Sequence, residues 1–355
     1  MKQNVAQIDK NFLAGSEIMR QDIDWYALPD EHFEICGLAQ AEDGLFYRLP
    51  ESLVDNVNEG VCTLGRHTAG GRIRFRTDSP FIAYRAQLRY TGSMSHMPLT
   101  GSAGTDLFLN GRALTTFRPA NDRAEWYDGF IEFLPEEMKD MEMGLPLYNG
   151  LQHIYVGVQT GSRVELPRAY AVDRPIVYYG SSITQGGCAS KPGNSYQGFL
   201  SRWLDADQIN LGFSGNGLGE SVMAEYIAGL TMSAFVLDYD YNAPTPEHLQ
   251  ATHEAFFKTV RAAQPDLPVI LVTRPPRGTF KDENMEQRRQ IIYQTYQNAK
   301  AAGDDQVWFV DGQTLFGDAD VCDCTMDGVH PNDLGFYKMA KVLYPVLKNA
   351  LNRIN

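Results

Sequence analysis

Residues 175–186 read PIVYYGSSITQG, a short apolar run that ends at a glycine and is followed at once by two serines. A run of this length, bounded by a proline and a glycine, is typical of a strand that is buried on both faces. Similar runs follow at intervals of roughly 30 residues, with helical stretches between them. They are QINLGF (208–213), AFVLDY (234–239), PVILVT (268–273) and VWFVDG (307–312). Apolar strands that alternate with helices predict a parallel five-stranded sheet covered on both faces, a doubly wound α/β domain.

The helical stretches carry their own boundary signals. Thr245-Pro246 places a good N-cap residue before a proline at the first helical position, where a helix does not use the missing N–H. Beyond it, apolar residues recur on one helical face, at Leu249, Phe256, Phe257 and Val260. We expect the last helix to run over about residues 334–351.

The first half of the chain has a different pattern. Between about residues 30 and 170, short apolar runs are broken by turn residues. The runs include GRIRFRT (71–77), FIAYRAQLRY (81–90), TDLFLNG (105–111) and HIYVGV (153–158). Ile73 and Phe75, like Phe81 and Ala83, are two residues apart, the period expected when one face of an antiparallel strand is buried. These features predict a β-sandwich.

Two local signals refine this division. Asn110-Gly111 follows a strand-like run, and Asn-Gly supplies the positive φ angles that a type I′ hairpin turn requires. The segment ELPRAYAVDR (165–174) separates the two patterns and is the expected boundary. We therefore expect a β-sandwich accessory domain over residues 1–170 and the α/β domain over residues 171–355.

The composition fits a chain of two globular domains. Of the 355 residues, 43% are hydrophobic and 21% are charged, so a sizeable core can be buried. The formal net charge of -13 and the lack of a basic run disfavour nucleic acid and anionic membranes as partners, because both are recognised by clustered Lys and Arg. An acidic protein suits a neutral substrate, such as an ester, better than a polyanion.

Cysteine usage and the N-terminal stretch favour a reduced, cytoplasmic compartment. The 5 cysteines are scattered and show neither a disulfide framework nor a zinc-finger spacing. The stretch MKQNVAQIDKNFLAGSE lacks the apolar core of a signal peptide, and no run of about 18 apolar residues occurs. We expect a soluble cytoplasmic protein without a membrane partner, although a chain whose leader had been removed would look the same. The sequence leaves open whether the protein forms a homo-oligomer.

The residues that follow the strands supply chemistry. In an open parallel sheet, ligands bind where the carboxyl ends of the strands meet. Ser182 follows the first strand, Gly215 the second and Asn242 the third, while Asp327 and His330 follow the fifth across a loop. The fold therefore brings a hydroxyl, a backbone amide, a side-chain amide, a carboxylate and an imidazole to one edge of the sheet.

These are the groups that acyl transfer requires. A serine hydroxyl becomes a good nucleophile when a histidine accepts its proton, and an acid fixes the tautomer of that histidine. The oxyanion of the tetrahedral intermediate needs N–H donors, each of which lowers the barrier by roughly 2.7–4 kcal/mol. Glycine at position 215 leaves its N–H accessible, and Asn242 offers a side-chain N–H. The short step from Asp327 to His330 lets one turn present both side chains.

Blocks of the α/β half resemble those of the SGNH hydrolases and occur in the same order. GSSIT (180–184) resembles the GDSL block, and NLGFSGNG (210–217) is similar to the second block. DYDYN (238–242) is similar to the third block and DGVHP (327–331) to the last. The blocks span most of the second half of the chain, so the resemblance is specific.

This resemblance implies a flavodoxin-like SGNH fold and a serine esterase. Ser182 falls on the nucleophile position, and His330 and Asp327 complete the triad. The implied oxyanion hole consists of the amides of Ser182 and Gly215 and the side chain of Asn242.

The β-rich half resembles a second, narrower family. His96-Met97-Pro98 followed by GTDLF (104–108) is similar to the motif of the GxDLY domain, a β-rich module that precedes SGNH esterases. The resemblance implies a bacterial esterase that removes acyl groups, often acetyl, from carbohydrates. Asp106 in this motif is either a structural residue near a strand end or a substrate-binding residue that reaches over the catalytic site.

Three positions depart from the family patterns. Ser181 stands where the GDSL block has aspartate, Asp240 where the third block has glycine, and Phe108 where the GxDLY motif has tyrosine. Asp238 and Asp240 either face solvent in a turn or position Asn242. Asp240 is also a candidate substrate-binding residue.

Rival interpretations of the same residues stay open at this stage. Ser182 alone would be read as a helix cap, and Ser181 is the adjacent rival nucleophile. Ser214 begins a pattern like the nucleophile elbow of α/β-hydrolases, but Asn216 replaces the glycine that this elbow needs. The glycine-rich segment 212–217 and Asp238 allow a nucleotide-binding oxidoreductase, although the glycine spacing differs from G-x-G-x-x-G. A carbohydrate-binding protein with an inactive esterase domain is a further class.

We therefore expect a serine esterase that forms an acyl-enzyme and hydrolyses short-chain acyl esters, foremost acetyl esters of carbohydrates. A thioesterase or lysophospholipase-type acylhydrolase is the alternative within the same chemistry. The reaction needs no metal and no organic cofactor, and the expected partner is a small-molecule or oligosaccharide ester.

Overall fold

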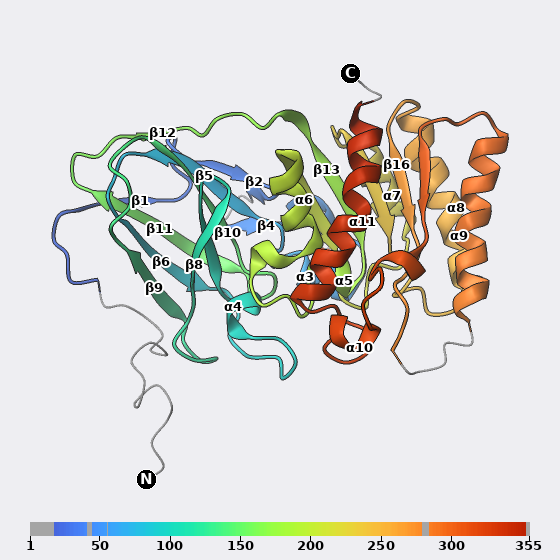
Figure 1. Ribbon diagram of the computed structural model, residues 1–355, viewed down its shortest axis with the longest axis horizontal. Coiled ribbons are helices and arrows are strands. Elements are labelled where there is room, and N and C mark those ends of the chain that lie inside the picture. Colours follow the sequence, from blue (N-terminus) through green and yellow to red (C-terminus); the bar gives the residue numbers. More distant parts are fainter. Residues whose placement is uncertain (1–17, 41–44, 55, 279–283, 353–355) are drawn as a thin grey trace, which may run out of the picture.

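The computed structural model describes residues 18–40, 45–54, 56–278 and 284–352. An antiparallel β-rich part, from the first half of the chain, lies beside a parallel α/β part from the second half (Figure 1). The predicted fold class is confirmed. The domain boundary at residue 170 stays a prediction, since residues of the first half also pack on the α/β part.

Two large antiparallel sheets form most of the β-rich part, and β3 and β4 pair as a separate small sheet. One has the strand order β1-β11-β6-β9, and the other has the order β12-β5-β10-β7-β8, with β2 also paired to β5. Apolar side chains from both sheets fill the space between them. The strands are β1 Ile23–Ala27, β2 Glu34–Cys36, β5 Arg72–Thr77, β6 Ile82–Leu88, β7 Thr105–Leu109, β8 Arg112–Phe117, β9 Trp126–Ile131, β10 Lys139–Gly144, β11 Leu151–Gln159 and β12 Val164–Glu165. The smaller elements are β3 Ala39–Gln40, β4 Phe46–Tyr47, α2 Glu51–Val54, α3 Glu59–Leu64 and α4 Leu99–Ser102.

The hairpin prediction is confirmed, and the prediction for strand β6 needs a correction. Asn110 and Gly111 join β7 to β8 with φ angles of 48° and 75°. In β6, however, Ile82 and Tyr84 face the core between the sheets, whereas Phe81, the residue just before the strand, packs on Phe130 with ring centroids 5.4 Å apart. Both faces are covered at this end of the strand, so its apolar residues show no clear alternation.

The parallel sheet has the order β14-β13-β15-β16-β17. Its strands overlap the five predicted runs and are β13 Val172–Gly180, β14 Ala206–Gly212, β15 Ala234–Asp238, β16 Val269–Val272 and β17 Val307–Val310. This is the flavodoxin-like order, in which the chain leaves β13 in one direction for β14 and returns on its other side for β15. Ligands bind at the carboxyl ends of the strands at such a switch point, which directs attention to the residues after Gly180.

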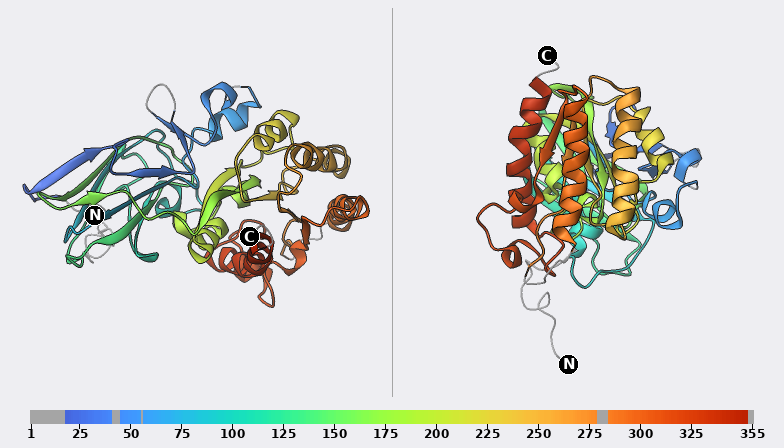
Figure 2. Two further views of the ribbon diagram at one scale, coloured as in Figure 1. Left: turned by 90° about the horizontal axis from the view of Figure 1, so that it is seen from above. Right: turned by 90° about the vertical axis from the view of Figure 1, so that its right-hand side faces the viewer.

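Helices cover both faces of this sheet (Figure 2). Helices α7 (Ser221–Ala228), α8 (Pro246–Ala263) and α9 (Met285–Ala301) pack on one face, while α6 (Tyr196–Leu204) and α11 (Asp333–Asn352) pack on the other. Helix α8 begins as predicted, because the Thr245 hydroxyl accepts the His248 N–H at 3.2 Å. Within the part of the chain that the structure describes, no helix has the length and apolar character needed to cross a membrane.

Buried polar contacts join the two parts. Arg48, from the β-rich part and only 2% exposed, donates hydrogen bonds to the carbonyls of Leu64, Asn210 and Gly212. Its guanidinium also lies over the ring of Phe213, 4.6 Å from the centroid. Burying a charge is costly unless hydrogen bonds compensate it. The bonds of the two terminal nitrogens therefore hold the end of β14 against the β-rich part, whereas Nε has no partner among the described residues.

Candidate active site

The two adjacent serines after β13 make different contacts. Ser181 is the N-cap of α5 (Ser182–Gln185), and its hydroxyl accepts the Ile183 N–H at 3.2 Å. The hydroxyl of Ser182 instead lies 2.9 Å from Nε2 of His330. The capping contact therefore belongs to Ser181, and the Ser182 hydroxyl faces an imidazole, which is the contact a nucleophile needs.

The turn between α10 (Val321–Cys324) and α11 presents Asp327 and His330 together. One carboxylate oxygen of Asp327 lies 2.7 Å from Nδ1 of His330, and the other accepts the backbone N–H of His330 at 2.8 Å. Partial burial opposes ionisation of Asp327, but the hydrogen bonds from His330 outweigh it and lower the pKa of the carboxyl. An ionised Asp327 favours the tautomer with the proton on Nδ1, which leaves the Nε2 lone pair facing Ser182.

N–H groups that can donate to a ligand lie on the loop that follows β14 and at the start of α5. Gly215 has a φ of +68°, and a Cβ built there would meet no atom within 4 Å, so its backbone stands in open space. Among the described residues, none accepts a hydrogen bond from the Gly215 N–H. The N–H of Ser182, as the first helical residue of α5, also lacks an acceptor within its helix.

Contacts at the base of this loop bring it to the end of β13. The Phe213 N–H donates to the Gly180 carbonyl at 3.0 Å, and the Asn242 side-chain amide donates to the Phe213 carbonyl at 2.8 Å. The amide of Asn242 has a second N–H that this bond does not use. The structure thus connects Ser182, His330 and Asp327 directly, and it places Gly215 and Asn242 on or against the adjoining loop.

Ser214, the rival nucleophile, is hydrogen-bonded to no histidine or carboxylate among the residues that the structure describes. Its hydroxyl lies 2.6 Å from the phenol of Tyr148, and its N–H donates to the side chain of Gln185. Burial raises the pKa of Tyr148 to about 12, so the phenol is protonated at neutral pH and does not take up a proton as a general base would.

The two candidate substrate-binding aspartates need a correction, because each is only 1% exposed. Asp106 accepts the Gly193 N–H at 2.7 Å and the Thr116 hydroxyl at 3.0 Å, which ties the β-rich part to the α/β part. Asp240 accepts the Arg274 N–H and pairs with Arg288 at 3.3 Å. Protein groups occupy both carboxylates and cover them from solvent, so both aspartates hold structural positions and neither is accessible to a substrate.

Asp238 also turns inward, which removes the basis for a nucleotide-binding oxidoreductase. Its carboxylate accepts hydrogen bonds from the Tyr196 phenol at 3.1 Å and the Thr184 hydroxyl at 3.2 Å. Burial raises the pKa of Asp238 to about 7. A carboxylate that is enclosed in this way does not reach the ribose of a bound nucleotide, which was its expected role in that alternative.

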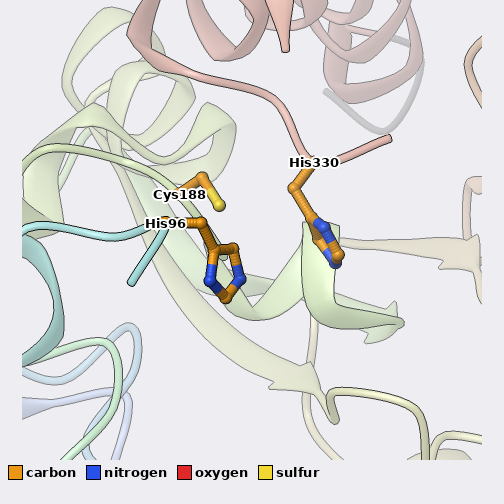
Figure 3. Close-up of side chains that lie close together, drawn as sticks. All are labelled: His96, Cys188 and His330. Atoms are coloured by element: carbon orange, nitrogen blue, oxygen red, sulfur yellow. The ribbon is translucent and has the colours of Figure 1, made fainter. Parts of the chain in front are cut away.

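Two side chains that had no assigned role lie beside His330 (Figure 3). His96, at the tip of the turn between Met94 and Met97, has its ring centroid 5.8 Å from that of His330. Cys188 lies in the turn after α5, and burial together with the charge of Asp327 raises the pKa of its thiol to about 12. In the motif of the β-rich half, His96 is therefore the residue that reaches the site, and Asp106 is not. The position of His96 in that motif could have indicated its proximity to the site, whereas no sequence motif indicated a position for Cys188.

Comparisons with known proteins agree with both resemblances. Residues 173–348 match the model of the GDSL-like lipase/acylhydrolase family, and residues 23–164 match the model of the GxDLY N-terminus of SGNH-hydrolase-type esterases. No curated protein matches the chain in sequence.

Similar solved structures extend over almost the whole chain. A GDSL-like lipase of Bacteroides ovatus is 27% identical, with a TM-score of 0.83, over 93% of this chain and 98% of that one. The salicylyl-acyltransferase SsfX3 of a tetracycline biosynthetic pathway is 19% identical, with a TM-score of 0.79, over 93% and 98%. An acetyl xylan esterase of the rumen bacterium Butyrivibrio proteoclasticus is 14% identical, with a TM-score of 0.58, over 93% and 99%. The last two likenesses show a shared fold.

Proposed function

We propose that this chain, which belongs to the GDSL-like lipase/acylhydrolase family and carries the N-terminal module of SGNH-type esterases, is a serine esterase for short acyl esters. Ser182 is the nucleophile, His330 the general base and Asp327 the residue that orients it. The observation that carries the proposal is the continuous hydrogen-bond chain from Asp327 through both ring nitrogens of His330 to the Ser182 hydroxyl.

In the first half of the reaction, the Ser182 oxygen bonds to the ester carbonyl carbon while its proton moves to Nε2 of His330. The carbonyl electrons shift onto oxygen, and the N–H groups of Ser182, Gly215 and Asn242 donate to that oxyanion. When the carbonyl re-forms, the bond to the alcohol breaks and His330 gives the alcohol its proton. Water then attacks the acyl-enzyme by the same steps, which releases the acid and restores Ser182.

The surroundings of this loop support a polar alcohol portion of the substrate. An open hollow beside the loop is lined by residues of α3 and by side chains of the loop itself. Its lining includes the polar side chains of Asn58, Thr63 and Ser214 beside the apolar ones of Leu64 and Leu218, and such polar groups can bond to sugar hydroxyls. We therefore propose an acetylated carbohydrate as the substrate class. One protein of the same fold, named above, is an acetyl xylan esterase.

The nucleophile is tested by labelling with a fluorophosphonate and by turnover of p-nitrophenyl acetate. Wild-type protein and Ser181→Ala should be labelled and active, whereas Ser182→Ala should be neither. Turnover by Ser182→Ala at the wild-type rate would contradict the proposal.

The substrate class is tested by measuring acetate release from acetylated xylo- and cello-oligosaccharides, with p-nitrophenyl acetate, p-nitrophenyl palmitate and acetyl-CoA as comparisons. The proposal expects the highest kcat/KM on an acetylated oligosaccharide. A preference for the palmitate ester or the thioester would replace it with an acylhydrolase of another substrate class. A cytoplasmic location and a reaction without cofactor stay predictions.

A further inference from the structure

The side chains gathered beside the catalytic histidine have the composition of a metal site. One ligand atom from each of His96, Cys188 and His330 lies within 4.8 Å of the other two, and Figure 3 shows the thiol and the two rings around one small space. Imidazole and thiolate are ligands that zinc prefers, and three protein ligands leave a fourth position for water. We propose that His96, Cys188 and His330 bind a zinc ion and that this zinc reversibly blocks the esterase site.

The hydrogen bond from His330 to Asp327 supports the role of this histidine as a ligand. Asp327 lies against Nδ1 of His330 at 2.7 Å, so the nitrogen left for a metal is Nε2. Histidines that bind metals nearly always bond a carboxylate or carbonyl through their other ring nitrogen, which orients the ring and raises its basicity. The pair that prepares His330 to accept a proton thus also prepares it to bind zinc.

The backbone at Cys188 gives independent support. Its φ is +78°, in the left-handed region where a residue other than glycine costs on the order of 1–3 kcal/mol. The preceding turn is held by the Gly187 N–H, which donates to the Ser182 carbonyl at 2.8 Å. The fold therefore keeps Cys188, with its buried thiol, at a backbone position that glycine would adopt at lower cost. A role of the thiol as a ligand would account for a cysteine there. On binding, the sulfur bonds to the metal and its proton passes to solvent.

The site closes by a small movement of His96. Zinc bonds of about 2.0–2.1 Å to nitrogen and about 2.3 Å to sulfur in a tetrahedral arrangement place the ligand atoms about 3.3–3.6 Å apart. The ligand atoms, which lie within 4.8 Å of one another, must therefore move closer by at most about 1.5 Å. Cys188 and His330 are fixed on the α/β part, whereas His96 lies at the tip of a turn of the β-rich part. Bound zinc would therefore tie the two parts together across the site.

The inhibitory consequence rests on the proposed function. The Nε2 lone pair that would bind zinc is the one that receives the Ser182 proton, and it does not serve both at once. Zinc binding itself does not depend on esterase activity, so binding and inhibition are measured separately.

Binding is tested with Co²⁺, a spectroscopic substitute for Zn²⁺, on full-length Ser182→Ala protein, which needs no turnover. We expect a thiolate-to-cobalt charge-transfer absorption that one equivalent of Zn²⁺ abolishes. The absorption should be lost in Ser182→Ala/Cys188→Ala and retained in Ser182→Ala/Cys322→Ala, which removes an exposed cysteine instead. If Ser182→Ala shows no such absorption, or if the Cys188 variant keeps it, the proposed site is wrong.

Inhibition is tested by titrating Zn²⁺ into the wild-type esterase and variants, each compared with its own rate without metal. His96→Ala and Cys188→Ala should each raise the half-inhibitory Zn²⁺ concentration at least tenfold. The matched controls His153→Ala and Cys322→Ala should stay within twofold of wild type. Equal Zn²⁺ sensitivity in all five proteins would overturn the inhibitory role. If Ser182→Ala shows the cobalt absorption but the wild-type protein hydrolyses no ester, the zinc site is supported and the proposed function is rejected.

Discussion

The guanidinium of Arg48 donates a hydrogen bond to the carbonyl of Gly212, the last residue of β14. Gly212 immediately precedes the loop that carries Gly215, so an arginine of the β-rich part determines where this loop begins. The same guanidinium bonds the carbonyl of Leu64 at 2.6 Å. The β-rich part is therefore structurally involved in the candidate site, although the residues of the proposed triad all come from the other half of the chain.

Replacing Arg48 with Leu removes the donor to several buried carbonyls. We expect the free energy of unfolding to fall by about 3–5 kcal/mol, because breaking a buried charged contact leaves its partners unsatisfied. Turnover should fall as well, since the start of the Gly215 loop loses its anchor. Urea denaturation measures the change, with Arg174→Leu, an arginine that is 58% exposed, as the control. Equal stability of the two variants would contradict the anchoring role.

Substitutions of the two neighbouring serines should affect different properties, Ser182→Ala the activity and Ser181→Ala the stability. Ser182→Ala removes the nucleophile and should lower kcat by roughly 10⁴–10⁶-fold with little change in melting temperature. Ser181→Ala removes the helix cap and should cost about 0.5–2 kcal/mol of stability while most of the turnover remains. Kinetics and thermal melts on both variants decide this. The reverse pattern would make Ser181 the nucleophile.

Asn242→Ala should remove one donor to the oxyanion. We expect kcat to fall by about 10²–10³-fold with little change in KM, because the interaction forms in the transition state and not with the bound ester. Since Asn242 also bonds the Phe213 carbonyl, a thermal melt must show that the variant remains folded. A rise in KM at constant kcat would instead assign Asn242 to ground-state binding.

Asp238 should make the stability depend on pH. Its folded-state pKa is raised from 3.8 to about 7 by burial, so the folded protein holds a proton that the unfolded chain releases. This contribution to stability is complete below pH 3.8 and is lost as the pH rises through about 7. One pKa unit corresponds to about 1.36 kcal/mol, so the loss is on the order of 4 kcal/mol.

Asp238→Asn cannot titrate and keeps an oxygen that accepts from Tyr196 and Thr184. We therefore expect the stability of the variant relative to wild type to increase between pH 4 and pH 8. Denaturant melts at several pH values measure it. Asp106, whose pKa burial raises to about 6, titrates in both proteins, so its contribution cancels in the comparison. A difference that does not change with pH would show that Asp238 is ionised in the fold.

The sequence was sufficient for the fold class and for the residues nominated for the triad, because both depend on local patterns. Apolar runs, the Thr245 cap and the Asn110-Gly111 turn each describe a few neighbouring residues, and the structure has all of them. The family blocks placed Ser182 and His330, which the structure brings into contact, although no comparison tests their catalytic roles.

Contacts between residues that are distant in the sequence could not be predicted in this way. For Asp106 and Asp240 the sequence left a structural and a substrate-binding role open, and their burial depends on Gly193 and Arg288, which are distant in the sequence. Nor could the pattern of β6 show which of its faces is the core, because apolar residues cover both. The proximity of His96 to His330 likewise depends on how the two parts pack, which no single motif encodes.

Tyr148, whose phenol reaches Ser214 from the β-rich part, has a consequence for protein engineering. A chimera that kept residues 171–355 and received an unrelated β module would inherit Ser182, Asp327 and His330 but lose both Tyr148 and Arg48. Such a chimera would retain esterase activity only if the new module supplied equivalents of Tyr148 and Arg48. Recombination among relatives should therefore keep each α/β part together with its own β-rich part.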